Sequence, residues 1–211
     1  MEIYLKLFDV LFPVFLIISI GYWYGKKDPS FDTTFITTFA GNIGLPSIIF
    51  YSLTTSGADI NLVFKFFFYT IFYVLIFSII SFLLLKILNK DPITLLPPLI
   101  LPNTGNMGMP ICLFAYGQLG LTIATAITSI ILVLHFSLGI LLASNKFSLK
   151  PLLRCVPIYV LIISILFVYK EIPPPKSLEN ATFLIGYSTI FLVLMSLGVA
   201  LAKIKIFSWK E

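Results

Sequence analysis

Long apolar runs separated by short polar stretches dominate the chain. A helix that crosses the hydrocarbon core of a bilayer needs about 20 mostly apolar residues. The runs of about this length cover residues 7–25, 35–54, 62–86, 94–116, 120–143, 152–169 and 180–202. The stretches between them carry Pro, Gly, Asn, Asp and Ser, as turns do, and none is long enough to fold separately. The pattern therefore predicts an all-α polytopic membrane protein with about seven transmembrane helices.

The fourth run differs from the others because residues 97–110 contain four prolines, two glycines and two asparagines. Each proline removes a backbone donor, and glycine weakens the helical state. We therefore expect this span to be broken near its middle. Within hydrocarbon, broken backbone is tolerated only where it is buried in protein or lines a watery cavity. The break is thus a candidate binding site, and a structural helix kinked by proline is the alternative.

Composition supports a membrane location. The chain has 211 residues, of which 59% are hydrophobic and 11% charged, and its mean hydropathy is +1.05. These values indicate an integral, multi-pass protein of the cell membrane, in contact with lipid. The net charge of +5 does not predict a nucleic-acid partner, because the basic residues lie singly or in pairs between apolar runs. Cys112 and Cys155 form neither a metal-binding nor a disulfide pattern, and we expect no metal and no cofactor.

Lysine and arginine are unequally divided between the two sides of the predicted topology. One side has ten: Lys26, Lys27, Lys86, Lys90, Lys146, Lys150, Arg154, Lys203, Lys205 and Lys210. The other side has four: Lys6, Lys65, Lys170 and Lys176. The positive-inside rule then places the N-terminus outside and the C-terminus in the cytoplasm.

Short sequence matches at one spacing suggest an internal repeat. Leu16–Ile20 in the first span matches Leu161–Ile165 in the sixth, and Ser52-Leu53 matches Ser196-Leu197 at nearly the same offset. Chance is the alternative for matches this short. A repeat at this spacing pairs span 1 with span 6. These two spans point in opposite directions, because five spans separate their starts, so the predicted design is a five-plus-five inverted repeat.

The repeat divides the chain into two parts. Residues 1–145 would hold the first repeat, with spans 1–5 and the broken span 4, and residues 146–211 would hold spans 6 and 7 of a second repeat. The counterpart of the broken stretch would lie beyond Glu211. We therefore expect the second repeat to be incomplete.

The segment PNTGNMGMP at residues 102–110, followed by Leu113–Gly117, resembles the fourth span of the auxin efflux carrier family of permeases. Supporting matches lie at residues 20–22, 45–46 and 195–201, and the resemblance covers essentially the whole chain. It implies ten spans in two inverted repeats, with broken fourth and ninth spans that cross near the middle of the membrane. It also implies transport of small organic anions, typically dicarboxylates such as malate or malonate in bacteria and auxin in plants.

The chain departs from that family pattern in two places. Spans 8 to 10 are missing, which puts autonomous transport in doubt. The segment Gly41–Gly44 is also more polar than expected in span 2. Asn42 is therefore either an additional site residue or part of a close helix contact, because small residues let membrane helices approach.

The candidate site can bind an anion without a buried lysine or arginine, because half-helix N-termini carry partial positive charge and free N–H donors. Amides and hydroxyls add donors, glycines allow close approach, and prolines fix where the helix opens. The candidate substrate-binding residues are Pro102, Asn103, Thr104, Gly105, Asn106, Gly108, Pro110 and Asn42. His135, within span 5, is either a proton relay or a neutral histidine bonded to a neighbouring helix.

The sequence favours a secondary-active carrier for a small organic anion such as a dicarboxylate, working by alternating access and coupled to a proton or a sodium ion. The alternative is a truncated or half carrier that does not transport by itself and needs a partner chain; a homodimer is another expected assembly. An enzyme is not expected, because the chain has one histidine and the spans contain no carboxylate pair and no metal-ligand cluster.

Overall fold

The computed structural model describes residues 2–139 and 150–204, and these residues form helices joined by short turns, without a strand among them. The prediction of an all-α protein is confirmed over this part of the chain. Residues 140–143 of the predicted fifth span, the repeat boundary at residue 145, and Lys146, Lys205 and Lys210 lie outside the described residues. The elements are α1 (Glu2–Lys27), α2 (Thr34–Phe39), η1 (Ala40–Gly44), α3 (Leu45–Thr55), α4 (Ile60–Ile87), α5 (Pro92–Ile100), η2 (Thr104–Gly108), α6 (Met109–Leu134), η3 (His135–Gly139), α8 (Lys150–Leu153), α9 (Val156–Tyr169) and α10 (Lys176–Lys203). The three η elements are π-helical turns.

Five helical segments of the described chain are long and apolar enough to cross a membrane. Four of them correspond to predicted spans 1, 2, 3 and 7. The fifth is the 46-residue segment Pro92–Ser137, which contains predicted spans 4 and 5. The helix of predicted span 6, α9, has 14 residues, fewer than the about 20 that a crossing needs. The count of seven spans and the inverted repeat remain predictions.

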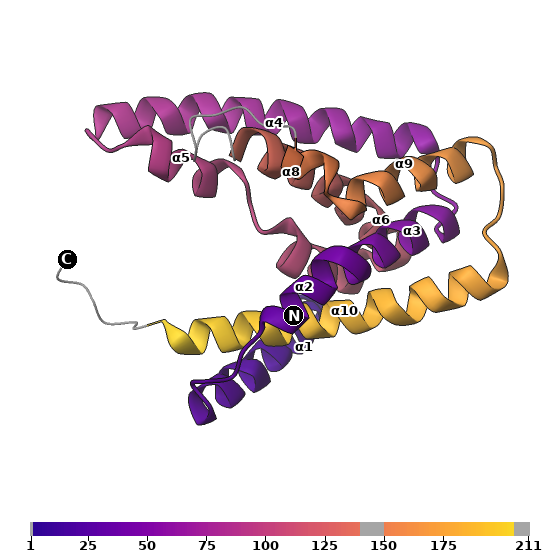
Figure 1. The fold of residues 1–211 in the computed structure, drawn as a ribbon, viewed down its shortest axis with the longest axis horizontal. Helices are drawn as coiled ribbons and strands as arrows, with labels where there is room; N and C mark the ends of the chain where they lie inside the picture. The colour runs from indigo at the N-terminus through magenta and orange to yellow at the C-terminus, as the bar shows by residue number, and fades with distance from the viewer. Residues whose placement is uncertain (1, 140–149, 205–211) are drawn as a thin grey trace.

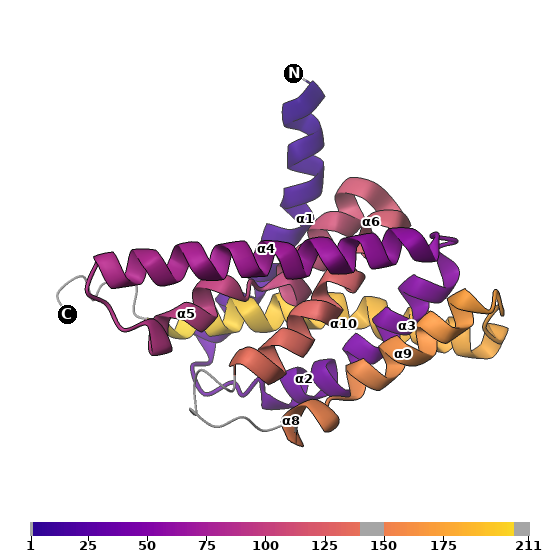
Figure 2. The ribbon, with the colours of Figure 1, turned by 90° about the horizontal axis from the view of Figure 1, so that it is seen from above.

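The helices pack in layers, which Figure 1 shows from the side. α4 and α5 lie along one edge, α3, α6 and α9 form the middle, and α1 and α10 lie along the opposite edge. The middle layer contains most of the fully buried side chains, among them Ile48, Ile49 and Leu121, which are at most 1% exposed. Figure 2 shows α4 and α10 running in the same direction across this layer.

The turn between α3 and α4 and the turn between α9 and α10 lie at the same end of the molecule, on the right in Figure 1. Residues 57–61 of the first turn and residues 171–173 of the second line one cavity. The C-terminal ends of α4 and α10 lie at the opposite end. There Lys203 donates a hydrogen bond of 2.7 Å to the carbonyl of Phe31, in the connection between α1 and α2.

α1 and α10 pack closely because glycines remove the side chains between them. A Cβ on Gly198 would overlap the backbone carbonyl of Ile18, and a Cβ on Gly21 would overlap that of Met195. Gly25 lies one helical turn further along α1, where an added Cβ would be 2.9 Å from the Cβ of Ala202. Small residues four apart on two membrane helices allow such backbone contact.

α5 begins at a well-formed cap. The carboxylate of Asp91 accepts hydrogen bonds from the Ile93 and Thr94 backbone N–H groups and, at 2.6 Å, from the Thr94 hydroxyl. The Thr94 hydroxyl and then the Ile93 N–H hold the pKa of this exposed carboxyl below its ordinary value. The capped helix has nine residues and is therefore about 14 Å long, roughly half of the hydrocarbon core, so it ends near mid-membrane if it starts at one surface.

Candidate functional site

The backbone leaves helical geometry between α5 and η2, where the break was predicted. Leu101 has φ −112° and ψ 86°, Asn103 has φ −76° and ψ 67°, and the Thr104 N–H donates to the Pro102 carbonyl at 2.9 Å. Pro102 has no N–H for the carbonyl of Pro98, so α5 cannot continue. The side chain of Asn103 accepts a 3.3 Å hydrogen bond from the Asn106 N–H and caps the next helical segment.

That next segment starts with a π-helical turn, and a proline explains the turn. Pro110 cannot donate to the carbonyl of Asn106 four residues earlier, and its ring excludes that carbonyl from normal α geometry. The Met109 N–H instead donates to the carbonyl of Thr104, five residues before it. π-helical turns of this kind are rare and occur frequently at functional sites.

The same six-residue motif occurs at η1. Residues 41–46 read Gly-Asn-Ile-Gly-Leu-Pro and residues 105–110 read Gly-Asn-Met-Gly-Met-Pro. In η1 the Leu45 N–H donates to the carbonyl of Ala40, again five residues before it. The two prolines thus produce the same local fold twice, and Asn42 and Asn106 occupy equivalent positions. The repeated motif is present in the sequence, but only the two π-helical turns show that it forms one local structure.

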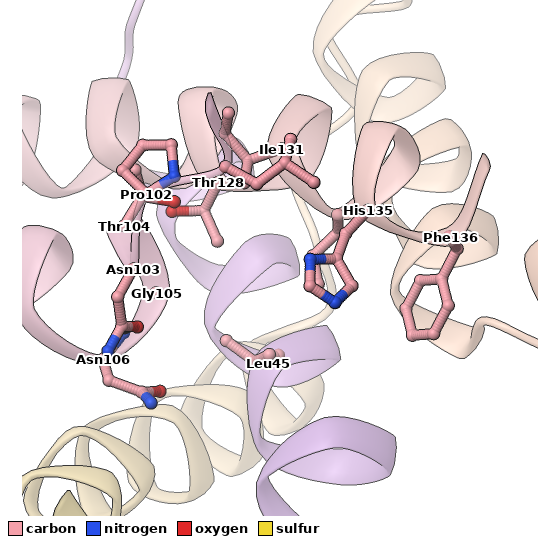
Figure 3. Close-up of a pocket in the computed structure, with 12 residues that line it drawn as sticks. Leu45, Pro102, Asn103, Thr104, Gly105, Asn106, Thr128, Ile131, His135 and Phe136 are labelled. Carbon is pink, nitrogen blue, oxygen red and sulfur yellow. Dashed lines mark hydrogen bonds between the residues drawn. The ribbon is translucent and has the colours of Figure 1, made fainter. Parts of the chain in front are cut away.

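A cavity of about 410 Å³ lies at the break. Its lining comes from the broken segment, from the second half of α6 with the start of η3, and from Leu45 just after η1. Figure 3 shows Asn103 and Asn106 on one side of the cavity, His135 and Phe136 on the opposite side, and Thr128 and Ile131 between them. Residues of η2 and η3 thus line the cavity together with Leu45, the first residue after η1.

Two hydroxyls at this cavity have no hydrogen-bond partner among the residues that the structure describes. The Oγ1 atoms of Thr104 and Thr128 are buried and unpartnered, and the Thr128 side chain belongs to a residue only 3% exposed. Thr125 and Ser129 on the same helix instead bond to the carbonyls of Leu121 and Thr125. A buried polar group without a partner is costly, and these two hydroxyls border a cavity in which a polar group could pair with them.

The two helix ends at the break have opposite polarity. α5 ends at Ile100 and presents its carboxyl end to the break, where the partial charge of the helix dipole is negative. The segment that starts at Thr104 presents its amino end, where the partial charge is positive. Opposed half-helix ends of this kind bind anions at the amino end and cations at the carbonyl end.

The structure brings six predicted site residues to the lining of this one cavity. They are Pro102, Asn103, Thr104, Gly105, Asn106 and His135. Gly108 is half-buried and Pro110 is fully buried, and neither lines the cavity, so Pro110 contributes by shaping the π-helical turn.

The residues of the segment around Asn42 have different surroundings. A Cβ on Gly44 would overlap the side chain of Thr189 on α10, so Gly44 serves close helix packing. Asn42 itself is exposed and lines a separate cavity of about 320 Å³. Asn42 therefore is not in the cavity at the break, but lies in the neighbouring one.

Sequence reasoning missed Thr128, Ile131, Leu132 and Phe136, which complete the lining. A signal was present, because Thr128, Ile131, Leu132 and His135 recur at the three- and four-residue spacing of one helix face. The histidine of span 5 thus marked the face that turns toward the break.

No protein-family model, no curated protein and no solved structure matches this chain.

Proposed function

We propose that this protein is a secondary-active carrier of a small organic anion such as a dicarboxylate, of the auxin efflux carrier type, working around the broken helix at residues 101–103. The proposal rests on the cavity at the break. Its lining includes the amino end of a helical segment and the residues Asn103 and Asn106. It also includes Thr104 and Thr128, whose buried hydroxyls have no partner among the described residues. These groups are donors suited to carboxylate oxygens. The apolar part of the lining comes from Leu45, Leu101, Ile131, Leu132 and Phe136.

Two helix contacts support an inverted repeat. The proposed repeat pairs α1 with α9 and pairs α2–α3 with α10. The counterpart of the α1–α10 contact is then a contact between α9 and α3. Both contacts are among the main helix packings in the structure, and α3 also packs on α10, a contact that such a repeat would map onto itself. An inverted repeat of this kind underlies alternating access in many secondary transporters.

The test is uptake of radiolabelled succinate or malonate by vesicles that contain the purified chain. Asn103→Ala and Asn106→Ala should each lower uptake about tenfold or more, because each removes a hydrogen bond to a charged ligand. Asn180→Ala, an exposed asparagine of α10, is the matched control and should leave uptake unchanged.

Folding must be checked in the same preparations, since Asn103 also caps the segment that follows it. A single symmetric peak in size-exclusion chromatography shows that a variant is folded. Unchanged uptake in both folded variants would refute the proposal. A folded wild-type chain that binds the anion but does not move it would identify an anion-binding membrane protein and not a carrier.

A further inference from the structure

The second copy of the Gly-Asn-x-Gly-x-Pro motif has a cavity of its own. This cavity of about 320 Å³ lies between η1, the end of α6 with η3, and the start of α9. Asn42 and Arg154 are its main polar side chains, and Cys155 and Val156 complete the end near α9. The motif thus places an asparagine beside a cavity in both of its occurrences.

Arg154 gives this second cavity a charge that the first one lacks. Its guanidinium is always protonated and presents several N–H groups in a plane, a geometry that fits both oxygens of a carboxylate. The side-chain amide of Asn42 offers two further donors. The amino end of α9 adds backbone N–H groups and partial positive charge at the same end of the cavity.

The two cavities are neighbours. Leu45, Leu132 and Phe136 line both of them, so the same three apolar side chains form the wall between the two. Phe136 belongs to the π-helical turn η3, where the helix is wider than an α-helix. An anion held at Arg154 is therefore one side-chain layer away from the break.

From this arrangement we propose that Asn42 and Arg154 form a second carboxylate-binding subsite, which holds the transported anion before it passes Phe136 to the cavity at the break. The identity of the ligand rests on the proposed carrier function. The subsite itself rests on the motif, the cavity and the two polar side chains that line it.

Cys155 lines the second cavity and provides a direct reporter of its occupancy. The experiment follows alkylation of the purified wild-type chain by a small neutral maleimide, with and without succinate, and reads each cysteine separately by mass spectrometry. Cys112 lines neither cavity and serves as the internal control. Saturating succinate should slow modification of Cys155 about tenfold, because ligand at ten times its dissociation constant leaves about one chain in ten unoccupied, and should leave Cys112 unchanged.

Substitutions then assign the protection to the subsite. Arg154→Gln should weaken succinate binding about tenfold, because it deletes a charge-assisted hydrogen bond, and should reduce the protection from about tenfold to about twofold at the same succinate concentration. Arg154→Lys keeps the charge and should retain part of the protection. Lys90→Gln is the matched control, since Lys90 is an exposed basic residue that lines neither cavity, and it should retain all of the protection.

The outcomes separate this inference from the carrier proposal. Unchanged alkylation of Cys155 in a chain that takes up succinate overturns the subsite alone, as does full protection that persists in Arg154→Gln. Protection without uptake overturns the carrier proposal and leaves the subsite standing. Protection by phosphatidylglycerol in vesicles without succinate, compared with phosphatidylcholine vesicles, would show that the arginine binds a lipid phosphate and would overturn the carboxylate assignment.

Discussion

The α1–α10 interface and the region around the break use glycine and polar groups in opposite ways. At the interface, an added Cβ on Gly21 or Gly198 would overlap backbone, so the two helices leave no free space between them. At the break, an added Cβ on Gly105 would meet its nearest atom, the Cγ2 of Thr128, at 3.5 Å, an ordinary contact. Glycine joins two helices in the first region and borders a cavity in the second.

Hydrogen bonding at the break also differs from that at another close contact of α10, its packing against η1. Thr189, on the face of α10 that packs against η1, donates to the carbonyl of Ile185 at 2.7 Å. Thr104 and Thr128, at the break, leave buried hydroxyls without partners. A closely packed scaffold therefore lies beside a region with buried polar groups that have no partner among the described residues, an arrangement that suits the proposed carrier.

The largest effect is expected at the closed interface. Gly198→Leu forces a side chain into the backbone of Ile18 and should destabilise the chain by more than about 3 kcal/mol, because a helix backbone cannot yield as a side chain can. The measurement is the thermal unfolding temperature in detergent, with the yield of monodisperse protein. Ala200→Leu adds a larger side chain to an exposed position of the same helix and should have little effect.

This prediction fails if both variants unfold at the wild-type temperature. That result would mean that α1 and α10 separate easily, and the distinction between a closed scaffold and an open site would be lost.

A smaller effect is expected at Gly117, the turn inside α6 that separates predicted spans 4 and 5. Its φ of 64° and ψ of −151° lie in a region that only glycine adopts readily. Gly117→Ala should therefore lower stability by about 1–3 kcal/mol. Gly41→Ala is the control, because no atom lies within 4 Å of an added Cβ there and its φ is not positive.

Equal stability of the two alanine variants would contradict the prediction. It would show that the chain around Gly117 accepts another conformation, so that the first and second halves of α6 are not held at a fixed angle.

Much of this fold was predictable because the bilayer imposes simple rules. Long apolar runs predicted the helices, and the run of prolines predicted the break. Pro102 stands where α5 ends and Pro110 follows the π-helical turn η2, because neither can donate a backbone hydrogen bond, whereas Pro97 and Pro98 lie inside α5. The ends of α4 and α10 lie within a few residues of the predicted spans. The orientation of the chain in the membrane, inferred from the distribution of lysine and arginine, stays a prediction.

The packing partners were not predictable, because in lipid nearly every helix face is apolar and hydropathy does not distinguish a buried face from a lipid-facing one. Only the four-residue spacing from Gly21 to Gly25, and from Gly198 to Ala202, marked the α1–α10 contact. The opposite wall of the cavity was missed for the same reason. Thr128 is a small residue in an apolar helix, and only its position two turns before His135 connects it with the break.

The finest test of the comparison uses two threonines on one helix. Thr125 donates to the carbonyl of Leu121 at 2.6 Å, whereas the Thr128 hydroxyl is buried without a partner. Thr125→Val should lower stability by about 0.5 kcal/mol, the usual worth of such a bond in a membrane protein. Thr128→Val should raise stability by about 1 kcal/mol, because it removes an unsatisfied polar group at nearly constant volume. It should at the same time reduce succinate uptake, which Thr125→Val should leave near the wild-type rate. Thermal unfolding and uptake measured on the same preparations distinguish these cases. A Thr128→Val chain that is less stable and transports normally would mean that the hydroxyl stabilises the fold and does not bind the ligand. The region around the break would then be a packed region like the α1–α10 interface.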